Sequence, residues 1–174
     1  MTPPDATITV DGDPVDWPAA AEALRPRDPV GDVAGAATLA MVDGVGLWLA
    51  RSATTLSARL ELAAPATTPA PGVEVHYTVV LRELRPRSLG PRVELDLTAG
   101  TPPVAQLLVD GQVQGGVTVA GALAGTTVEL AVALSDLQPF LAAGTPWLTC
   151  FATSAHDGAR NLDASDQGRA VIVP

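Results

Sequence analysis

Lysine is absent from this 174-residue sequence, although most soluble proteins contain it. All ten basic residues are arginines, and 19 acidic residues bring the formal net charge to −9. Without lysine, Schiff-base chemistry and the phosphate-binding lysine of a Walker loop are excluded. An acidic chain without a basic cluster does not neutralise a row of phosphates, so we expect neither nucleic acid nor an anionic membrane as a partner.

Cysteine is nearly absent, because Cys150 is the only one. This excludes an internal disulfide and a cysteine-based zinc cluster. Long apolar runs are missing too: no stretch approaches the ~20 residues that span a bilayer, so we expect no membrane insertion. The start of the chain has neither the basic nor the apolar region of a signal peptide. A cytoplasmic protein and an excised mature domain both remain open on this ground.

Aromatic residues make up only 3% of the chain, so we expect a core of Val, Leu and Ala with three Trp as the large pieces. Apolar and polar residues alternate along many short runs separated by Gly or Pro, which is typical of half-buried antiparallel strands. Strands are expected near residues 6–10, 36–42, 45–51, 56–62, 73–82, 92–98, 104–109, 112–119, 127–134, 147–154 and 169–173. About ten strands in one chain of this size predict an all-β, antiparallel two-sheet sandwich of jelly-roll type. We expect residues 1–174 to form a single domain.

Turn chemistry supports this interpretation. The triplet Val-Asp-Gly occurs three times, and at residues 42–44 and 109–111 it separates two apolar stretches. Since Asp-Gly tolerates the positive φ angles of a type I′ turn, each of these two is predicted to close a hairpin. Short helical turns are expected at residues 18–24, following Asp16, and at residues 135–141, with Ser135 as the N-cap.

The order of these elements resembles the sugar-binding sandwiches of the family-9-like carbohydrate-binding modules, which are related to the DOMON domains. The resemblance rests on segments that follow one another in the family's order: residues 8–18, 27–35, 39–51, 56–62, 128–137 and 161–168. The first of them contains an acidic Asp-Gly turn and an Asp-Trp pair. The resemblance implies a jelly-roll sandwich that is often extracellular or in the cell envelope, sometimes stabilised by calcium and sometimes sugar-binding. DOMON-type relatives hold haem instead.

Acidic residues gather in two early loops, which makes them the candidate metal ligands. The candidates for a structural calcium site are Asp11, Asp13, Asp16, Asp28 and Asp32. Calcium prefers six to eight oxygen ligands from such loops. The alternative is structural, because Asp11 is suited to forming the turn and Asp16 to capping the helical turn that follows.

Four residues are the candidates for contact with a ligand: Trp48, Trp147, His76 and Glu74. Sugars bind to exposed aromatic faces with polar groups at the rim. Trp48 lies on the opposite side of its strand from its two Leu neighbours, and His76 lies on the outward side of its own strand. In the competing interpretation all three Trp, including Trp17, fill the core.

Catalysis finds little support, since no catalytic motif is present and neither histidine has a local partner pattern. Paired carboxylates on the polar sides of strands, from Glu74, Glu94, Asp96 and Glu129, remain a formal route to catalysis. The sequence therefore favours a non-catalytic binding module whose partner is a carbohydrate, and a structural or protein-interaction domain without a small ligand is the alternative. A haem-binding electron-transfer subunit is a weaker alternative. Met41, His76 and His156 would be its axial ligands, and the lysine that some such relatives use is missing.

Overall fold

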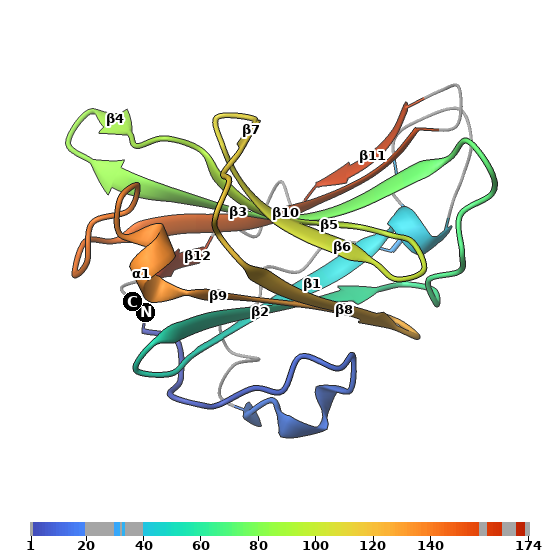
Figure 1. Ribbon diagram of the computed structural model, residues 1–174, viewed down its shortest axis with the longest axis horizontal. Helices are drawn as coiled ribbons and strands as arrows, with labels where there is room; N and C mark the ends of the chain where they lie inside the picture. The colour runs from blue at the N-terminus through green and yellow to red at the C-terminus, as the bar shows by residue number, and fades with distance from the viewer. Residues whose placement is uncertain are drawn as a thin grey trace.

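Two antiparallel β-sheets pack face to face in the computed structural model, which describes residues 2–19, 30–31, 33, 40–156, 160–164 and 170–172 (Figure 1). The smaller sheet has the order β1 (Gly44–Arg51), β2 (Thr55–Leu62), β9 (Thr127–Ala133) and β8 (Val119–Ala124). The larger sheet has the order β11 (Arg160–Ala164), β10 (Trp147–His156), β3 (Glu74–Arg85), β5 (Val93–Thr98), β6 (Val104–Val109) and β7 (Gln112–Val113). In addition, β12 (Ala170–Ile172) pairs with β10, and β4 (Ser88–Leu89) pairs with β3. The helical elements are η1 (Pro14–Asp16), η3 (Ala40–Val42) and α1 (Leu134–Leu137). The all-β sandwich expected from the sequence is confirmed.

The core lies between the sheets and follows the predicted alternation. Its members share the inward side of their strands, as the fully buried Leu56, Leu95, Leu97 and Leu130 illustrate. The two sheets are in close contact at Gly121 of β8, where a Cβ atom would lie 2.6 Å from Ala105 Cβ and 2.9 Å from Leu97 Cδ1. Because no side chain fits in that space, glycine at this position sets the spacing between the sheets. In the described part of the chain, no helix is long and apolar enough to cross a bilayer.

The two predicted hairpins differ in outcome. Asp110 and Gly111 have φ angles of 49° and 79° and join β6 to β7, as a type I′ turn requires. The hairpin predicted at residues 42–44 is wrong, because the chain before it forms η3 and Gly44 begins β1. Gly44 is needed there for close packing, since a Cβ atom would lie 2.6 Å from Phe151 Cε2.

Several other local expectations are also wrong. The strand expected at residues 6–10 is reduced to a single bridge between Asp5 and Arg51, because the chain then leaves the sheet edge. The strand expected at residues 112–119 is split into β7 and β8, since the chain crosses here from the larger sheet to the smaller one. Ser135 is not an N-cap: it lies inside α1, whose N-cap is Ala133. Most of the helical turn expected at residues 18–24 lies outside the described residues.

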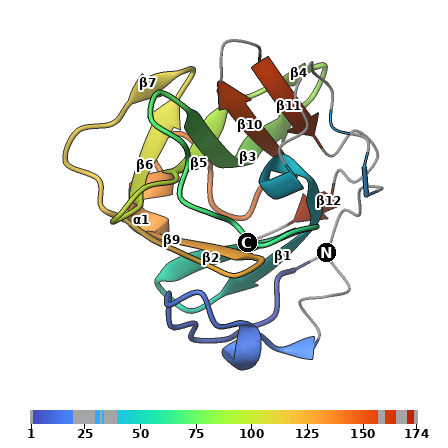
Figure 2. The ribbon, with the colours of Figure 1, turned by 90° about the vertical axis from the view of Figure 1, so that its right-hand side faces the viewer.

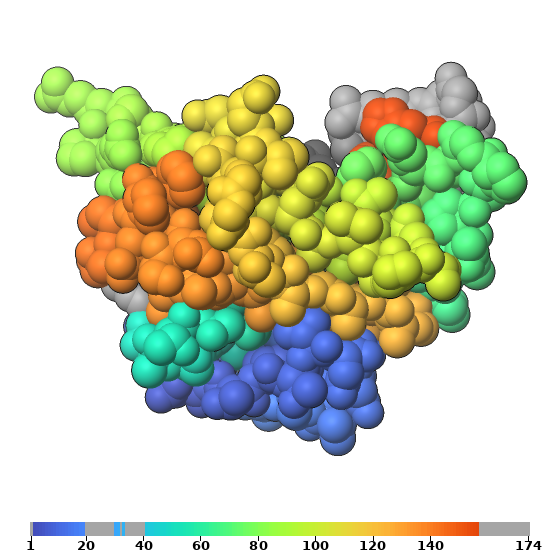
Figure 3. Space-filling model, viewed as in Figure 1, coloured from blue at the N-terminus to red at the C-terminus, as the bar shows by residue number. Residues whose placement is uncertain are grey.

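The outer side of the smaller sheet is covered by the N-terminal segment, defined as residues 5–17 (Figures 1 and 3). The buried carboxylate of Glu129, on β9, holds this segment. Its Oε2 accepts hydrogen bonds from the backbone N–H groups of Asp11 (3.0 Å) and Gly12 (2.8 Å), and its Oε1 accepts one from Trp17 Nε1 (2.6 Å). The guanidinium of Arg59, the cross-strand neighbour of Glu129, lies over the ring of Trp17 and over that of a second tryptophan on β1.

The outer side of the larger sheet is concave. Figures 1 and 2 show β7 and β11, at its two edges, rising on the side that faces away from the smaller sheet. In Figure 3 the β3–β4 turn and the β6–β7 segment stand above their surroundings along this upper rim, with a notch between them. The fold thus covers one sheet face with its own N-terminal segment and leaves the other face without that cover.

Candidate functional site

The concave side of the larger sheet carries a cluster of polar side chains, here called the polar face. Its members are Glu74, His76, Thr78, Asp96, Thr98, Gln106 and Ser154, which all lie on the outward side of their strands. The register places them in rows across the sheet. One row contains Ser154, His76 and Thr98, and the next contains Thr78, Asp96 and Gln106. Residues up to 80 positions apart in the chain, Glu74 and Ser154, therefore lie on one surface.

The centre of the polar face is the contact between His76 and Asp96. His76 Nδ1 lies 3.0 Å from Asp96 Oδ2, while Thr78 Oγ1 donates a hydrogen bond of 2.8 Å to Asp96 Oδ1. Asp96 is only 5% exposed, and each of its two carboxylate oxygens has a hydrogen-bond partner. These two contacts fix the position of the carboxylate. Because an ionised carboxylate only accepts, Nδ1 of His76 carries the proton, and Nε2 faces the exposed Glu74 carboxylate at 3.9 Å. This is how a ring at a surface becomes pre-oriented for binding.

Charge around His76 shifts its titration. The hydrogen bond that His76 donates to Asp96 raises the pKa of His76 above its ordinary value of 6.5, and the charges of Asp96 and Glu74 add to this, whereas partial burial of the ring opposes it. Glu74 Oε2 lies 3.9 Å from His76 Nε2, and the His156 ring meets the His76 ring edge-on at 6.5 Å. A protonated His76 is therefore favoured in the folded state compared with the unfolded chain.

This shift predicts a pH dependence of stability. A group whose pKa is higher in the folded state stabilises fully below its unfolded pKa, and that stabilisation is lost as the pH rises through the folded pKa. We expect the free energy of unfolding, measured with urea, to fall as the pH rises from 6.5, and His76→Gln to lack this component. In an NMR titration the His76 midpoint should lie above 6.5 in the wild type and lower in Asp96→Asn. A wild-type midpoint at or below 6.5 would contradict the assigned role of Asp96.

A strip of mainly apolar residues, interrupted by Glu94, runs beside the polar face. Val80, which is 4% exposed, has Cys150 as its partner on one neighbouring strand, and on the other side Glu94 lies between Val80 and Leu108. The strip ends at Val113 of β7, which is 58% exposed. Hydrogen-bonding groups and apolar surface thus lie next to each other, an arrangement that suits a ligand with both kinds of surface.

The predicted aromatic ligand contacts are placed differently from what stacking needs. Trp48 does lie on the outward side of β1, but the N-terminal segment and Arg59 cover it, and it is 4% exposed. Trp147 is 2% exposed in the core, where its Nε1 donates to the carbonyl of Ala142. Neither ring offers an open face, because each is used in packing. Trp17 is also packed, at 9% exposure.

The predicted calcium ligands that the structure describes each have a hydrogen bond within the N-terminal segment. Asp11 Oδ1 accepts from the backbone of Asp13, Asp13 Oδ1 accepts from the backbone of Val15 and so caps η1, and Asp16 Oδ2 accepts from the backbone of Thr9. Among the described residues, no three His, Cys, Asp or Glu side chains lie close enough to hold a metal ion. Asp28 and Asp32 lie outside the described residues, and calcium binding by this loop stays a prediction.

The residues named as candidates for paired-carboxylate catalysis and for haem ligation are also separated in the structure. Glu74, Glu94 and Asp96 share the outer side of the larger sheet, but Glu129 lies buried beneath the N-terminal segment. For haem, Met41 belongs to the core cluster, whereas His76 lies on the opposite side of the larger sheet. The structure does not bring that ligand set together.

Most of the polar face was not identified in the sequence. Thr78, Thr98, Gln106 and Ser154 carried no signal beyond their outward position in an alternating run. Only the strand order and register bring them beside His76, and neither is readable from a single sequence. Glu74 and His76 are the two predicted ligand residues that lie here.

Comparison with known proteins places the fold. No family model and no curated protein matches the sequence. Two solved structures are similar, both titled as a carbohydrate-binding module of family 9 from Caldicellulosiruptor kristjanssonii. The one in complex with cellotriose is 15% identical with a TM-score of 0.52, covering 93% of this chain and 82% of that chain. The one in complex with glucose is 12% identical with a TM-score of 0.46, covering 93% of this chain and 84% of that chain. The chain has a β-sandwich fold similar to that of the family 9 carbohydrate-binding modules.

Proposed function

We propose that the protein is a non-catalytic carbohydrate-binding module and that the polar face is its binding surface. The observation that carries this proposal is the His76–Asp96 contact: a buried carboxylate with both oxygens engaged orients a partly exposed ring on a concave sheet. Rigid groups of this kind bind sugar hydroxyls at a low entropic cost, because they are ordered before the ligand arrives.

The composition of the concave side of the larger sheet further supports a sugar. Sugars present hydroxyl groups at their edges and C–H groups on their faces, so they need hydrogen-bonding partners and apolar contact together. The polar face supplies the first, and the strip from Val80 to Val113 supplies the second. The cellotriose bound to the similar family 9 module makes a β-linked glucan the first ligand class to test.

The test is a titration with cellotriose and with glucose, followed by calorimetry and by amide NMR shifts. We expect shifts on β3, β5, β6 and β10, and a roughly tenfold weaker affinity in His76→Ala, since a lost hydrogen bond and ring contact cost about 1.4 kcal/mol. Gln106→Ala should also weaken binding. Gln138→Ala, the same substitution at the exposed C-cap of α1, is the matched control and should bind as the wild type does.

Two results would contradict this assignment. If neither sugar shifts any amide at tens of millimolar, the proposed function fails. If binding occurs but His76→Ala leaves it unchanged, the surface is wrongly assigned. Far-UV circular dichroism of each variant separates loss of binding from loss of folding.

A protein-interaction role is the second candidate, and one observation favours it. Val104 and Val113, which lie towards the β7 edge of the larger sheet, are 59% and 58% exposed. Exposed valines beside an edge strand are suited to pairing with another chain. Concentration-dependent self-association that Val113→Lys abolishes, together with no sugar binding, would favour this candidate.

A further inference from the structure

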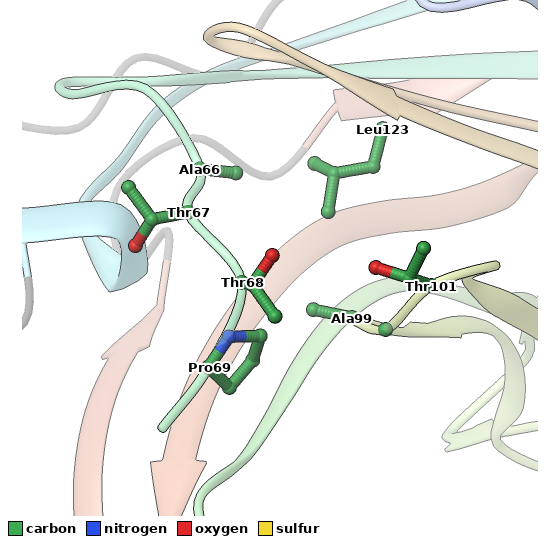
Figure 4. A pocket seen from close by; sticks show the side chains of 8 residues that line it. Ala66, Thr67, Thr68, Pro69, Ala99, Thr101 and Leu123 are labelled. Atoms are coloured by element: carbon green, nitrogen blue, oxygen red, sulfur yellow. The ribbon is translucent and has the colours of Figure 1, made fainter. Parts of the chain in front are cut away.

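A hollow lies at one end of the sandwich, beyond the end of β5 that carries Thr98 of the polar face, and is here called the end cavity (Figure 4). Its volume is about 160 Å³. It is lined by Ala66, Thr67, Thr68, Pro69, Ala99, Gly100, Thr101 and Leu123. These residues come from the loop between β2 and β3, the loop between β5 and β6, and β8, so the cavity opens between the two sheets.

The accessible lining of the end cavity is mainly polar, with hydroxyl groups at its rim. Thr68 and Thr101 are exposed, and Figure 4 shows their hydroxyl oxygens directed towards the space between them from opposite sides. Ala66, Ala99 and Leu123 are partly buried and supply the small apolar part of the walls. A mainly polar lining suits a ligand that presents several hydroxyl groups.

Both rim hydroxyls are available for a ligand. Within the described part of the chain, neither Thr68 Oγ1 nor Thr101 Oγ1 takes part in a hydrogen bond, whereas Thr67 Oγ1 donates to Met41 Sδ at 3.5 Å. A hydroxyl donates one hydrogen bond and accepts two, so the pair offers up to six interactions. No charged side chain lines the cavity, which removes the basis for selecting an ion.

The walls are held before any ligand arrives. The backbone N–H of Ala66 donates to the carbonyl of Gly125 at 2.7 Å, which ties the first loop to the β8–β9 turn. The backbone N–H of Ala99 donates to the carbonyl of Val75 at 2.8 Å, which ties the second loop to β3. The two rims are therefore fixed to different sheets, and their separation depends on the sandwich itself.

Size and chemistry together define the occupant. About 160 Å³ is below the ~300–1,000 Å³ of sites for drug-sized ligands, so a single small ring fits and a chain of sugars does not. We propose that the end cavity is a second binding site that takes one neutral polyhydroxylated ring or polyol. This inference is independent of the polar face, because the two sites share no residue.

The test uses D-glucose, its acid D-glucuronate and glycerol as probes, with amide NMR spectra of the whole chain. We expect glucose to shift the amides of Gly100 and Thr101 in the wild type, and glucuronate to shift them less, since no cation lines the cavity. Thr68→Val removes one hydroxyl at nearly constant volume and should weaken this binding about three- to tenfold. Thr118→Val, at an exposed position outside the cavity, is the matched control and should change nothing.

The experiment separates this inference from the proposed function. In His76→Ala, the shifts on the polar face should need a roughly tenfold higher sugar concentration, while those at Gly100 and Thr101 should keep their wild-type concentration dependence. Ala99→Leu, which fills the cavity, should give the opposite pattern, and Thr68→Val on its exposed loop keeps the test valid if Ala99→Leu does not fold. If neither glucose nor glycerol shifts the cavity amides, or if Thr68→Val leaves those shifts unchanged, the inference is overturned, whatever happens at the polar face.

Discussion

Replacing Glu129 by Ala is expected to lower the free energy of unfolding by about 3–5 kcal/mol, as measured by urea denaturation. The carboxylate is fully buried and accepts three hydrogen bonds, two from backbone N–H groups in the N-terminal segment and one from Trp17 Nε1. Its removal leaves those donors without an acceptor. It also removes the negative charge from the cross-strand neighbour of Arg59. Since this side chain accepts three of the hydrogen bonds that hold residues 5–17 on the smaller sheet, we also expect faster proteolysis within them.

Two further variants test that explanation. Asp5→Ala removes an exposed carboxylate from the same segment and should change stability by less than about 0.5 kcal/mol. Trp17→Phe and Glu129→Gln form a double-mutant cycle, in which the direct hydrogen bond should appear as a coupling energy of about 1–3 kcal/mol. A Glu129→Ala variant as stable and as protease-resistant as the wild type would show that the segment is held by other contacts.

Replacing Gly121 by Val is expected to destabilise the protein by about 2–5 kcal/mol, or to prevent folding, because the sheets touch there. Even the first added carbon would lie 2.6 Å from Ala105 Cβ and 2.9 Å from Leu97 Cδ1, and both neighbours are held in the larger sheet. The sheets would have to separate locally, which opens gaps elsewhere in the core. Thermal denaturation of purified protein measures the effect.

The control for this variant lies on the same strand. Ala120→Val introduces the same side chain on the exposed side of β8 and should be neutral or slightly stabilising, since β-branched residues suit strands. Ala105→Gly should recover part of the stability of Gly121→Ala, because it removes the nearer of the two clashing atoms. A Gly121→Val protein with wild-type stability would mean that the sheets are not in contact at this position.

The sequence predicts the sandwich well because alternation is a local property. Whether Leu95 and Leu97 face inward is decided within β5 itself, and so is the turn at Asp110 and Gly111. The chain's switch between sheets after β7 was missed, because Gly115 and Gly116 permit a bend but do not say where the next strand pairs.

The candidate site was less predictable for the same physical reason. Trp48 was correctly placed on the outward side of its strand, but what covers that side is a segment more than 30 residues earlier in the chain, held by a carboxylate 81 positions later. Likewise, Asp96 reads as one more surface acid until the register sets it beside His76 and Thr78. Long-range contacts decide both outcomes, and a single sequence carries no direct signal for them.

Because Trp17 and Trp48 pack against Arg59 beneath or within the N-terminal segment, tryptophan fluorescence can report whether that segment is attached. Trp17 and Trp48 are shielded from water only while the N-terminal segment stays on the smaller sheet, whereas Trp147 is shielded by the core between the sheets. Detachment of the segment alone should therefore shift part of the intrinsic fluorescence to longer wavelength and leave the remainder unchanged. Complete unfolding should shift all of it. If the emission changes in two steps as denaturant is added, the N-terminal segment unfolds as a cooperative unit separate from the two sheets.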